Sequence, residues 1–440
     1  MAVEADKLAA LRERFSHLAR RTRASRRRLA LILAVIGPGI ITSNVDNDAG
    51  GITTYTLTGA QFGYTLLWSL IPLTIALYVS EEMCARMGVV TGKGLSDLIR
   101  EEFGFRSTFF VMLAALAVDL GNTVAEFAGV AAAMQIFGIT KYVSVPLAGL
   151  VVWFLVVRGN SRQVEKIFLI ACGFYLTYVI SAVLAKPDWV LAAKSVVNPT
   201  TFRLDRDYLL MFVALVGTTI APWQFFYLQA GFVEKRVGPR QYKHARLDVL
   251  AGSITCMAIV FFIIVCTAAT LNVRGMTDIT DAAQAAQALR PLAGRFAAAL
   301  FAFGLLNASL FAASILPLST AHVICEGLGF EAGIDNKMRE APIFYGLYTG
   351  LIVVGGGIIL IPHAPLLKIL LLSQVANGIW LAPVLIFILL LINRKDLMGE
   401  HVNKLGFNIL AWVISIIMIG ITLFLGYVTL FPPPGISSGG

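Results

Sequence analysis

The chain has 440 residues, of which 58% are hydrophobic and only 14% charged, and its formal net charge is +9. Soluble domains carry about 25% charged residues, so this composition excludes a soluble globular protein and indicates a polytopic membrane protein. The basic residues gather in short segments between apolar runs. That pattern is typical of cytoplasmic loops and argues against a nucleic-acid partner.

We expect an all-α protein with eleven spans, each near the ~20 residues that cross a bilayer. A basic segment over residues 1–28 precedes the first span and is predicted to be cytoplasmic. The second span is predicted to end at Glu81 and Glu82, and a short amphipathic helix ending at Phe103 precedes the third. The predicted spans cover residues 29–59, 63–82, 107–136, 141–157, 164–185, 207–233, 248–271, 293–322, 342–361, 365–392 and 405–430.

The basic loops fall on one side of these spans throughout. This predicts a bacterial cytoplasmic (inner) membrane protein with its N-terminus inside and an exterior tail over residues 431–440. We find no pattern of a membrane enzyme, such as a nucleophile–base pair or a phosphate-binding loop. We therefore expect no enzymatic activity and no cofactor.

The first span is interrupted by the polar stretch Asn44–Gly51, which contains Asp46, Asp48 and two glycines. A charged side chain inside a bilayer costs roughly 2.5–3.5 kcal/mol on insertion scales, so such residues usually face a cavity and serve a function. Unwound backbone at this depth is tolerated only where protein or water surrounds it. The stretch therefore predicts a broken helix that forms half of a binding site.

The sixth span is interrupted at Thr218–Pro222. Proline alone is consistent with an ordinary kink, but this break lies five spans after the first. Because five is odd, the two broken spans run in opposite directions. The pattern predicts two inverted five-helix repeats, over residues 29–185 and 207–392, followed by span 11 over residues 405–430. Corresponding breaks in inverted repeats indicate a substrate site near the midplane of a secondary transporter.

The broken helices suggest which atoms meet the substrate. The first half of span 1 ends near Val45 with unpaired carbonyl groups, and the free amides near Gly51 favour an ionised Asp48. Carbonyl groups around Thr218 play the same part in span 6. One carboxylate with several carbonyl oxygens describes a site for a hard cation. For Asp46 two interpretations stay open: attraction of cations in the outer vestibule, or simple solvation.

These residues and several motifs elsewhere resemble the Nramp family of divalent-metal transporters, whose members have the LeuT-type inverted-repeat fold. The resemblance covers most of the chain. The motifs that carry it are Gly37-Pro38-Gly39, Gly59-Ala60-Gln61-Phe62-Gly63-Tyr64, Ala85-Arg86-Met87-Gly88-Val89-Val90-Thr91-Gly92-Lys93, Ala125-Glu126-Phe127-Ala128-Gly129 and Ser373-Gln374-Val375.

The chain departs from the family pattern at three places. The Asp-Pro-Gly-Asn motif of span 1 reads Asp48-Ala49-Gly50-Gly51, and the Met-Pro-His-Asn motif of span 6 reads Ala221-Pro222-Trp223-Gln224. In span 3, Asp-x-x-Glu reads Thr123-Val124-Ala125-Glu126. The soft thioether ligand, the histidine and one relay carboxylate are absent. A roomier site with few protein ligands suits a partly hydrated Mg²⁺.

This pattern resembles the Nramp-related magnesium transporters, a prokaryotic branch of the family. It implies transport of Mg²⁺, and also of Mn²⁺, by a monomer without proton coupling. The predicted metal site comprises Asp48, Gly51, Val45, Thr218, Ala221 and Gln374. Secondary candidates along the pathway are Asp46, Asn47, Gln224 and Glu126.

For two of these residues a purely structural role stays open. Glu126 is also interpreted as a hydrogen-bonded structural residue, and Gln374 as a helix–helix contact. Asn122, Asn307 and Asn377 are predicted to make polar contacts between helices. Among alternative functions, a proton-coupled Mn²⁺/Fe²⁺ carrier of the ordinary Nramp type is the first, and a LeuT-type carrier of amino acids or organic cations is the second.

Overall fold

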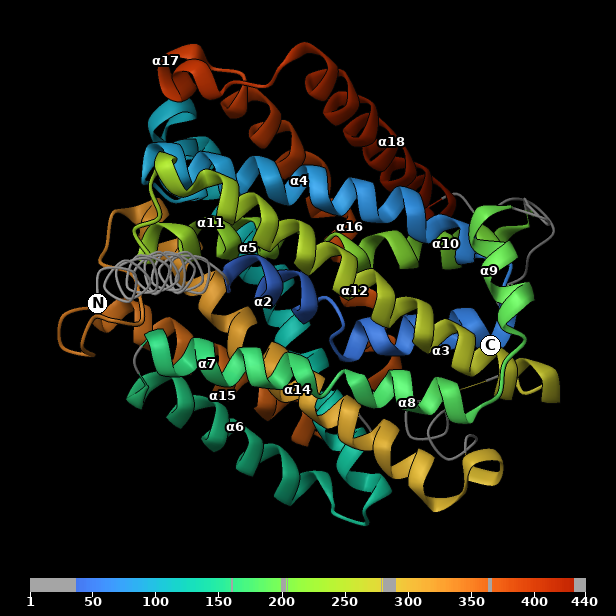
Figure 1. Ribbon diagram of the computed structural model, residues 1–440. Helices are drawn as coiled ribbons and strands as arrows, with labels where there is room; N and C mark the ends of the chain where they lie inside the picture. Colours follow the sequence, from blue (N-terminus) through green and yellow to red (C-terminus); the bar gives the residue numbers. More distant parts are fainter. Residues whose placement is uncertain are drawn as a thin grey trace, which may run out of the picture.

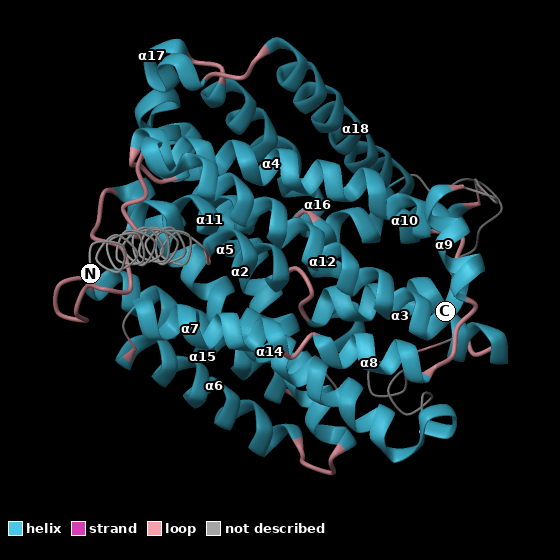
Figure 2. Cartoon of the chain, in the orientation of Figure 1, coloured by secondary structure: helices cyan, strands magenta, loops and turns pink. Residues whose placement is uncertain are grey.

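The computed structural model describes residues 37–159, 161–198, 203, 205–277, 279, 290–362 and 366–430. Helices joined by loops account for this part of the chain (Figure 2). The predicted basic segment 1–28 and the predicted tail 431–440 lie outside the described residues.

The described helices follow the predicted spans in order. Seven of them are long and apolar enough to cross a bilayer, and a bent pair at residues 376–401 makes an eighth. Apart from spans 1 and 6, the helices of these spans are α4 (Leu70–Thr91), α5 (Leu95–Ile136), α6 (Lys141–Arg158), α7 (Ser161–Gly173), α8 (Leu176–Leu184), α12 (Tyr242–Thr270), α14 (Arg290–Leu328), α15 (Pro342–Leu360), α16 (Leu366–Ile392), α17 (Lys395–Met398) and α18 (Leu405–Leu430).

Both predicted breaks are present. Span 1 consists of α2 (Pro38–Val45) and α3 (Ala49–Phe62), and span 6 of α10 (Arg206–Thr219) and α11 (Pro222–Glu234). The two parts of span 1 lie in the middle of the molecule, joined by a short loop (Figure 1). α2 packs against α11, and α3 packs against α10. The two breaks therefore lie side by side.

The second span differs from its prediction. Gly63 has a φ of 59° and turns the chain after α3, so α4 begins only at Leu70. It continues past the two glutamates to Thr91 and ends at Gly92, whose left-handed backbone (φ 66°, ψ 20°) closes the helix. The prediction that the second span ends at Glu81 and Glu82 is therefore wrong, because α4 continues past them and both are buried inside it.

Two other boundaries follow local backbone chemistry. Gly104 has non-helical dihedrals (φ 78°, ψ 173°), and this kink divides α5 into the predicted short helix and the predicted third span. The loop before span 6 contains an unpredicted helix, α9 (Trp189–Val197). It begins where the Asp188 side chain accepts hydrogen bonds from two backbone amides of its first turn.

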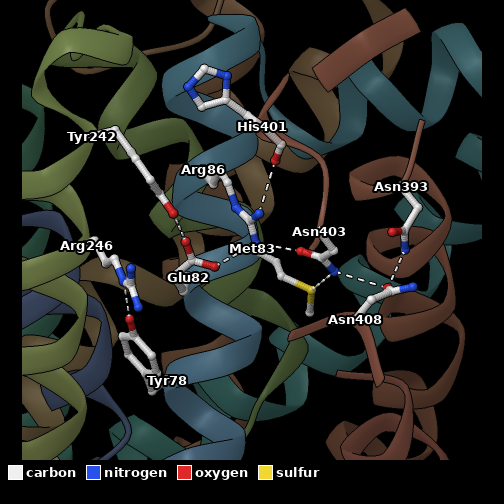
Figure 3. A network of polar contacts seen from close by, with 10 residues as sticks. All are labelled: Tyr78, Glu82, Met83, Arg86, Tyr242, Arg246, Asn393, His401, Asn403 and Asn408. Carbon is white, nitrogen blue, oxygen red and sulfur yellow. Dashed lines mark hydrogen bonds and ion pairs between the residues drawn. The ribbon is translucent and has the colours of Figure 1, made fainter. Parts of the chain in front are cut away.

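A buried polar network joins the ends of α4, α12 and the segment before α18, at the face predicted to be cytoplasmic (Figure 3). Arg86 donates to Glu82 at 2.8 Å, to Asn403 at 2.6 Å and to the His401 carbonyl oxygen at 3.0 Å. Glu82 also accepts a hydrogen bond from Tyr242. This network explains the burial of Glu82, since each of its carboxylate oxygens has a partner.

Candidate metal-binding site

Asp48 is held at the start of α3. It is the N-cap residue of that helix, and its Oδ1 accepts a hydrogen bond of 2.6 Å from the Gly51 amide. A negative charge is favoured at this position because the free amides and the dipole of α3 point toward it. A side chain at Gly51 would collide with the Asp46 carbonyl oxygen and lie 3.3 Å from Asp48 Oδ1. Gly51 therefore contributes backbone and space.

Glu126 of α5 reaches the same helix start. Its Oε2 accepts a hydrogen bond of 3.2 Å from the Ala49 amide, and its carboxyl group also contacts that of Asp48. Glu126 is 1% exposed. The close approach of α5 requires Gly129, because a Cβ there would collide with Ala49. Glu126 thus accepts a hydrogen bond at the start of α3, as a structural residue would. It also lies beside Asp48, as a residue of the pathway would.

Gln374 of α16 lies over the glycines of the first break. A Cβ at Gly50 would collide with Gln374 Nε2 and would lie 3.3 Å from Asp48 Oδ1. The Gln374 side-chain amide and the Asp48 carboxylate therefore share the space above Gly50. On its other side, the backbone of Gln374 passes Gly217 of α10. The structure brings Asp48, Gln374 and span 6 together.

The break in span 6 lacks charged groups. Ala221 has an extended backbone (φ −93°, ψ 137°) and is 3% exposed, and Pro222 opens α11. The Thr218 hydroxyl and both amide atoms of Gln224 are buried without a hydrogen-bond partner. Buried polar atoms are normally paired. These unpaired groups fit a substrate or its water shell, whereas Ala221 offers only its backbone carbonyl group.

Asp46 and Asn47 point away from this group. Asp46 is 1% exposed, and neither of its oxygens has a hydrogen-bond partner. Both earlier interpretations of Asp46, vestibule attraction and solvation, are therefore wrong, because the side chain is buried and absent from the outer cavity. Asn47 donates to Cys256 Sγ of α12 at 3.5 Å. Val45, the last residue of α2, is completely buried.

A cavity of about 680 Å³ opens on the face predicted to be extracellular. Its lining includes Thr54 and Gln61 of α3 and Ala214 of α10. Thr54 donates to the Gly50 carbonyl oxygen at 2.9 Å, so the cavity extends to within one helical turn of the break. Asp48 remains 6% exposed. The cavity therefore approaches the break in span 1 from that face.

Sequence reasoning missed Asp119 of α5. This carboxylate is completely buried and accepts hydrogen bonds from Thr320 at 2.8 Å and Asn122 at 3.3 Å. The signal was an aspartate within an apolar run, one turn before Thr123. The predicted contacts between helices are confirmed: Asn122 and Asn377 bond each other at 3.0 Å, and Asn307 donates to the Ala171 carbonyl oxygen.

The donor set at the break is oxygen-rich and carries little charge. Within the described residues no group of three or more His, Cys, Asp or Glu side chains is placed to hold a metal ion. Asp48 and Glu126 are the carboxyl groups at the helix start, and carbonyl, hydroxyl and amide groups surround them. Such ligands suit a hard divalent cation that keeps part of its water shell.

Comparison with known proteins agrees with this geometry. Residues 39–427 match the family model described as "Natural resistance-associated macrophage protein-like". The divalent metal cation transporter MntH of Deinococcus radiodurans is 28% identical over 409 residues, which cover 90% of this chain and 89% of the relative. MntH of Yersinia enterocolitica is 25% identical over 414 residues, covering 92% and 96%.

Solved structures show the same fold. The manganese transporter of Eremococcus coleocola has a TM-score of 0.74 at 20% identity, covering 92% of this chain and 89% of its own. Mhp1, a nucleobase–cation symporter, has a TM-score of 0.59 at 15% identity, covering 90% and 91%. The all-helical LeuT-type architecture is thereby confirmed. Because the family model spans nearly the whole chain, this protein is a member of the Nramp family of divalent metal cation transporters and not an enzyme.

Proposed function

We propose that this transporter carries Mg²⁺, and also Mn²⁺, into the cytoplasm through the two breaks, with the ion partly hydrated and without proton coupling. It acts as a monomer in the bacterial cytoplasmic membrane, with its N-terminus inside. The two halves, residues 29–185 and 207–392, move as inverted repeats around the site. The membrane potential supplies roughly 2.3 kcal/mol per charge per 100 mV, and twice that for a divalent ion.

The observation that carries the choice of ion is the alanine at position 221, at the break in span 6. This position presents a methyl group where a soft sulfur ligand would select manganese or iron. Asp48, whose Oδ1 accepts a hydrogen bond from the Gly51 amide, supplies a carboxylate at the start of α3. A partly hydrated Mg²⁺ requires few direct ligands and tolerates amide and hydroxyl contacts through water. Gln374, Thr218 and Gln224 provide such contacts.

A second candidate function is proton-coupled Mn²⁺ transport. It is favoured by the relatives, one of which is a manganese transporter. It is also favoured by the contact between the Asp48 and Glu126 carboxyl groups, since a carboxyl pair that holds a proton must release it when a cation binds. The two functions differ in ion selectivity and in proton movement, and each difference is measurable.

The test of selectivity uses the purified protein in liposomes containing dyes that report Mg²⁺, Mn²⁺ or Cd²⁺ entry. We expect Mg²⁺ entry in the native protein and its loss in Asp48→Ala. Ala221→Met adds a thioether and should raise Cd²⁺ entry relative to Mg²⁺ at least tenfold, whereas Ala221→Leu, of similar size without sulfur, should not. Mn²⁺ entry without Mg²⁺ entry would overturn the magnesium assignment.

The test of coupling measures internal pH during uptake at a clamped membrane potential. We expect metal entry to follow the potential and the internal pH to stay constant. Acidification in step with metal entry, lost in Glu126→Gln, would establish the coupled alternative. Empty liposomes with a proton ionophore control for leakage.

A further inference from the structure

We propose that Asp46 and Glu81 form a second binding site for a divalent cation, separate from the site at Asp48. This inner carboxylate pair lies between the end of α2, the middle of α4 and α12. The proposal does not depend on which ion is transported or on how transport is coupled.

Burial and missing partners are the first observation. Asp46 is 1% exposed and Glu81 0% exposed. Both oxygens of Asp46 and the Oε1 of Glu81 have no hydrogen-bond partner, and neither residue forms an ion pair within the described part of the chain. An uncompensated buried charge is strongly unfavourable, and buried carboxylates are accordingly paired or bind metals. A cation between the two carboxylates would supply the partner that these free oxygens lack.

The Asp46 side chain points to a different side of the break from Asp48, and this separates the inner carboxylate pair from the site at Asp48. Asp46 follows Ser43 by three residues and has a helical backbone (φ −61°, ψ −18°), so the two side chains lie on one face at the end of α2. Ser43 on that face donates to Glu81 Oε2 of α4, and the next residue, Asn47, donates to Cys256 Sγ of α12. Asp46 thus faces α4 and α12, whereas Asp48 faces α5 and α16. One loop between α2 and α3 presents carboxylates on both sides.

Glu81 is oriented before any ion binds. Ser43 of α2 donates to Glu81 Oε2 at 2.7 Å, and Ser253 of α12 donates to the same oxygen at 3.3 Å. These two bonds hold Oε2 and leave Oε1 free. The close contact of α2 with α12 depends on Gly39 and Gly252, where a Cβ would meet the opposite backbone. Hydroxyl groups from two helices therefore preposition one carboxylate oxygen.

The ligand chemistry points to a small, hard divalent cation. Two carboxylates balance a charge of +2, and the neighbouring hydroxyl groups are oxygen donors, which Mg²⁺ and Mn²⁺ accept. The buried side-chain carbonyl oxygen of Asn47 also lacks a hydrogen-bond partner. The neutral groups around Glu81 complete an oxygen environment.

The experiment counts Mn²⁺ bound per chain by the loss of the electron paramagnetic resonance signal of free Mn²⁺, using the full protein in detergent. The decisive background is Asp48→Asn, which removes the carboxylate at the transport site. We expect two ions in the native protein, one in Asp48→Asn and none in Asp48→Asn/Glu81→Gln. Asp48→Asn/Glu81→Asp, which keeps the charge, should recover binding with weaker affinity.

Glu101→Gln, a substitution of an exposed carboxylate, is the matched control and should leave both ions bound. Circular dichroism and thermal unfolding check that each variant is folded. If Asp48→Asn binds no Mn²⁺, or if adding Glu81→Gln leaves its bound ion in place, the inner site does not exist. Failure of the proposed transport function appears elsewhere, as metal entry that survives Asp48→Ala.

Discussion

The short helix α2 depends on a carboxylate from another span. Asp248 of α12 accepts hydrogen bonds from the backbone amides of Gly37 at 3.1 Å, Gly39 at 2.7 Å and Ile40 at 3.4 Å. A helix start leaves four amides without partners inside the helix, and Asp248 serves three of those at this end. α2 has only eight residues, and helices of that length are unstable by themselves.

Asp248→Ala should therefore unfold α2 locally. Each buried amide left unpaired costs about 1–3 kcal/mol, and Asp248 pairs three amides, so its loss costs at least about 3 kcal/mol. That energy corresponds to opening that is faster by roughly 100-fold. Hydrogen exchange of the amides of Ile41–Val45, measured by mass spectrometry on protein in lipid nanodiscs, should rise by that factor.

Two control variants distinguish the loss of this helix cap from destabilisation of the whole protein. Asp248→Asn keeps one carbonyl acceptor and should give an intermediate exchange rate. Asp188→Ala removes the equivalent cap of α9, where Asp188 accepts from Val190 and Leu191 at 3.0 Å, and should leave α2 unchanged. If Asp248→Ala leaves the exchange of α2 at the native rate while Asp188→Ala accelerates α9, the capping argument is wrong.

Three further predictions concern the surroundings of the site. Gly50→Ala places a methyl group on the Gln374 amide and should abolish metal entry in liposomes, whereas Gly346→Ala, where no atom lies within 4 Å of the added Cβ, should not. Thr320→Val removes a 2.8 Å hydrogen bond to buried Asp119 and should lower stability by about 1–3 kcal/mol in thermal unfolding, with Thr320→Ser near native; equal melting temperatures for the two variants would contradict this. Arg86→Lys cannot reach all three acceptors of the network in Figure 3 and should speed proteolysis between residues 393 and 405, and an unchanged rate would show that the network does not hold this segment.

The sequence predicted the features that are local along the chain. Aspartates and glycines interrupt the first span around Asp48, and threonines and a proline interrupt the sixth at Thr218–Pro222. The structure has its two helix breaks there. The predicted role of the Gly51 amide toward Asp48 also required only neighbouring residues, because an N-cap is formed within one turn. The polar contacts of Asn122 and Asn377 followed from their positions inside spans.

The tertiary structure decided which way side chains point. A helix surrounded by lipid and other apolar helices has no polar face that reveals its rotation, so the sequence did not show that Glu81 is buried beside α2 and α12. For the same reason the sequence did not show which helices Asp46 faces. Asp119 was missed because its partner Thr320 lies 201 residues away in sequence. These contacts depend on the packing of distant helices, which bring together groups that no local pattern connects.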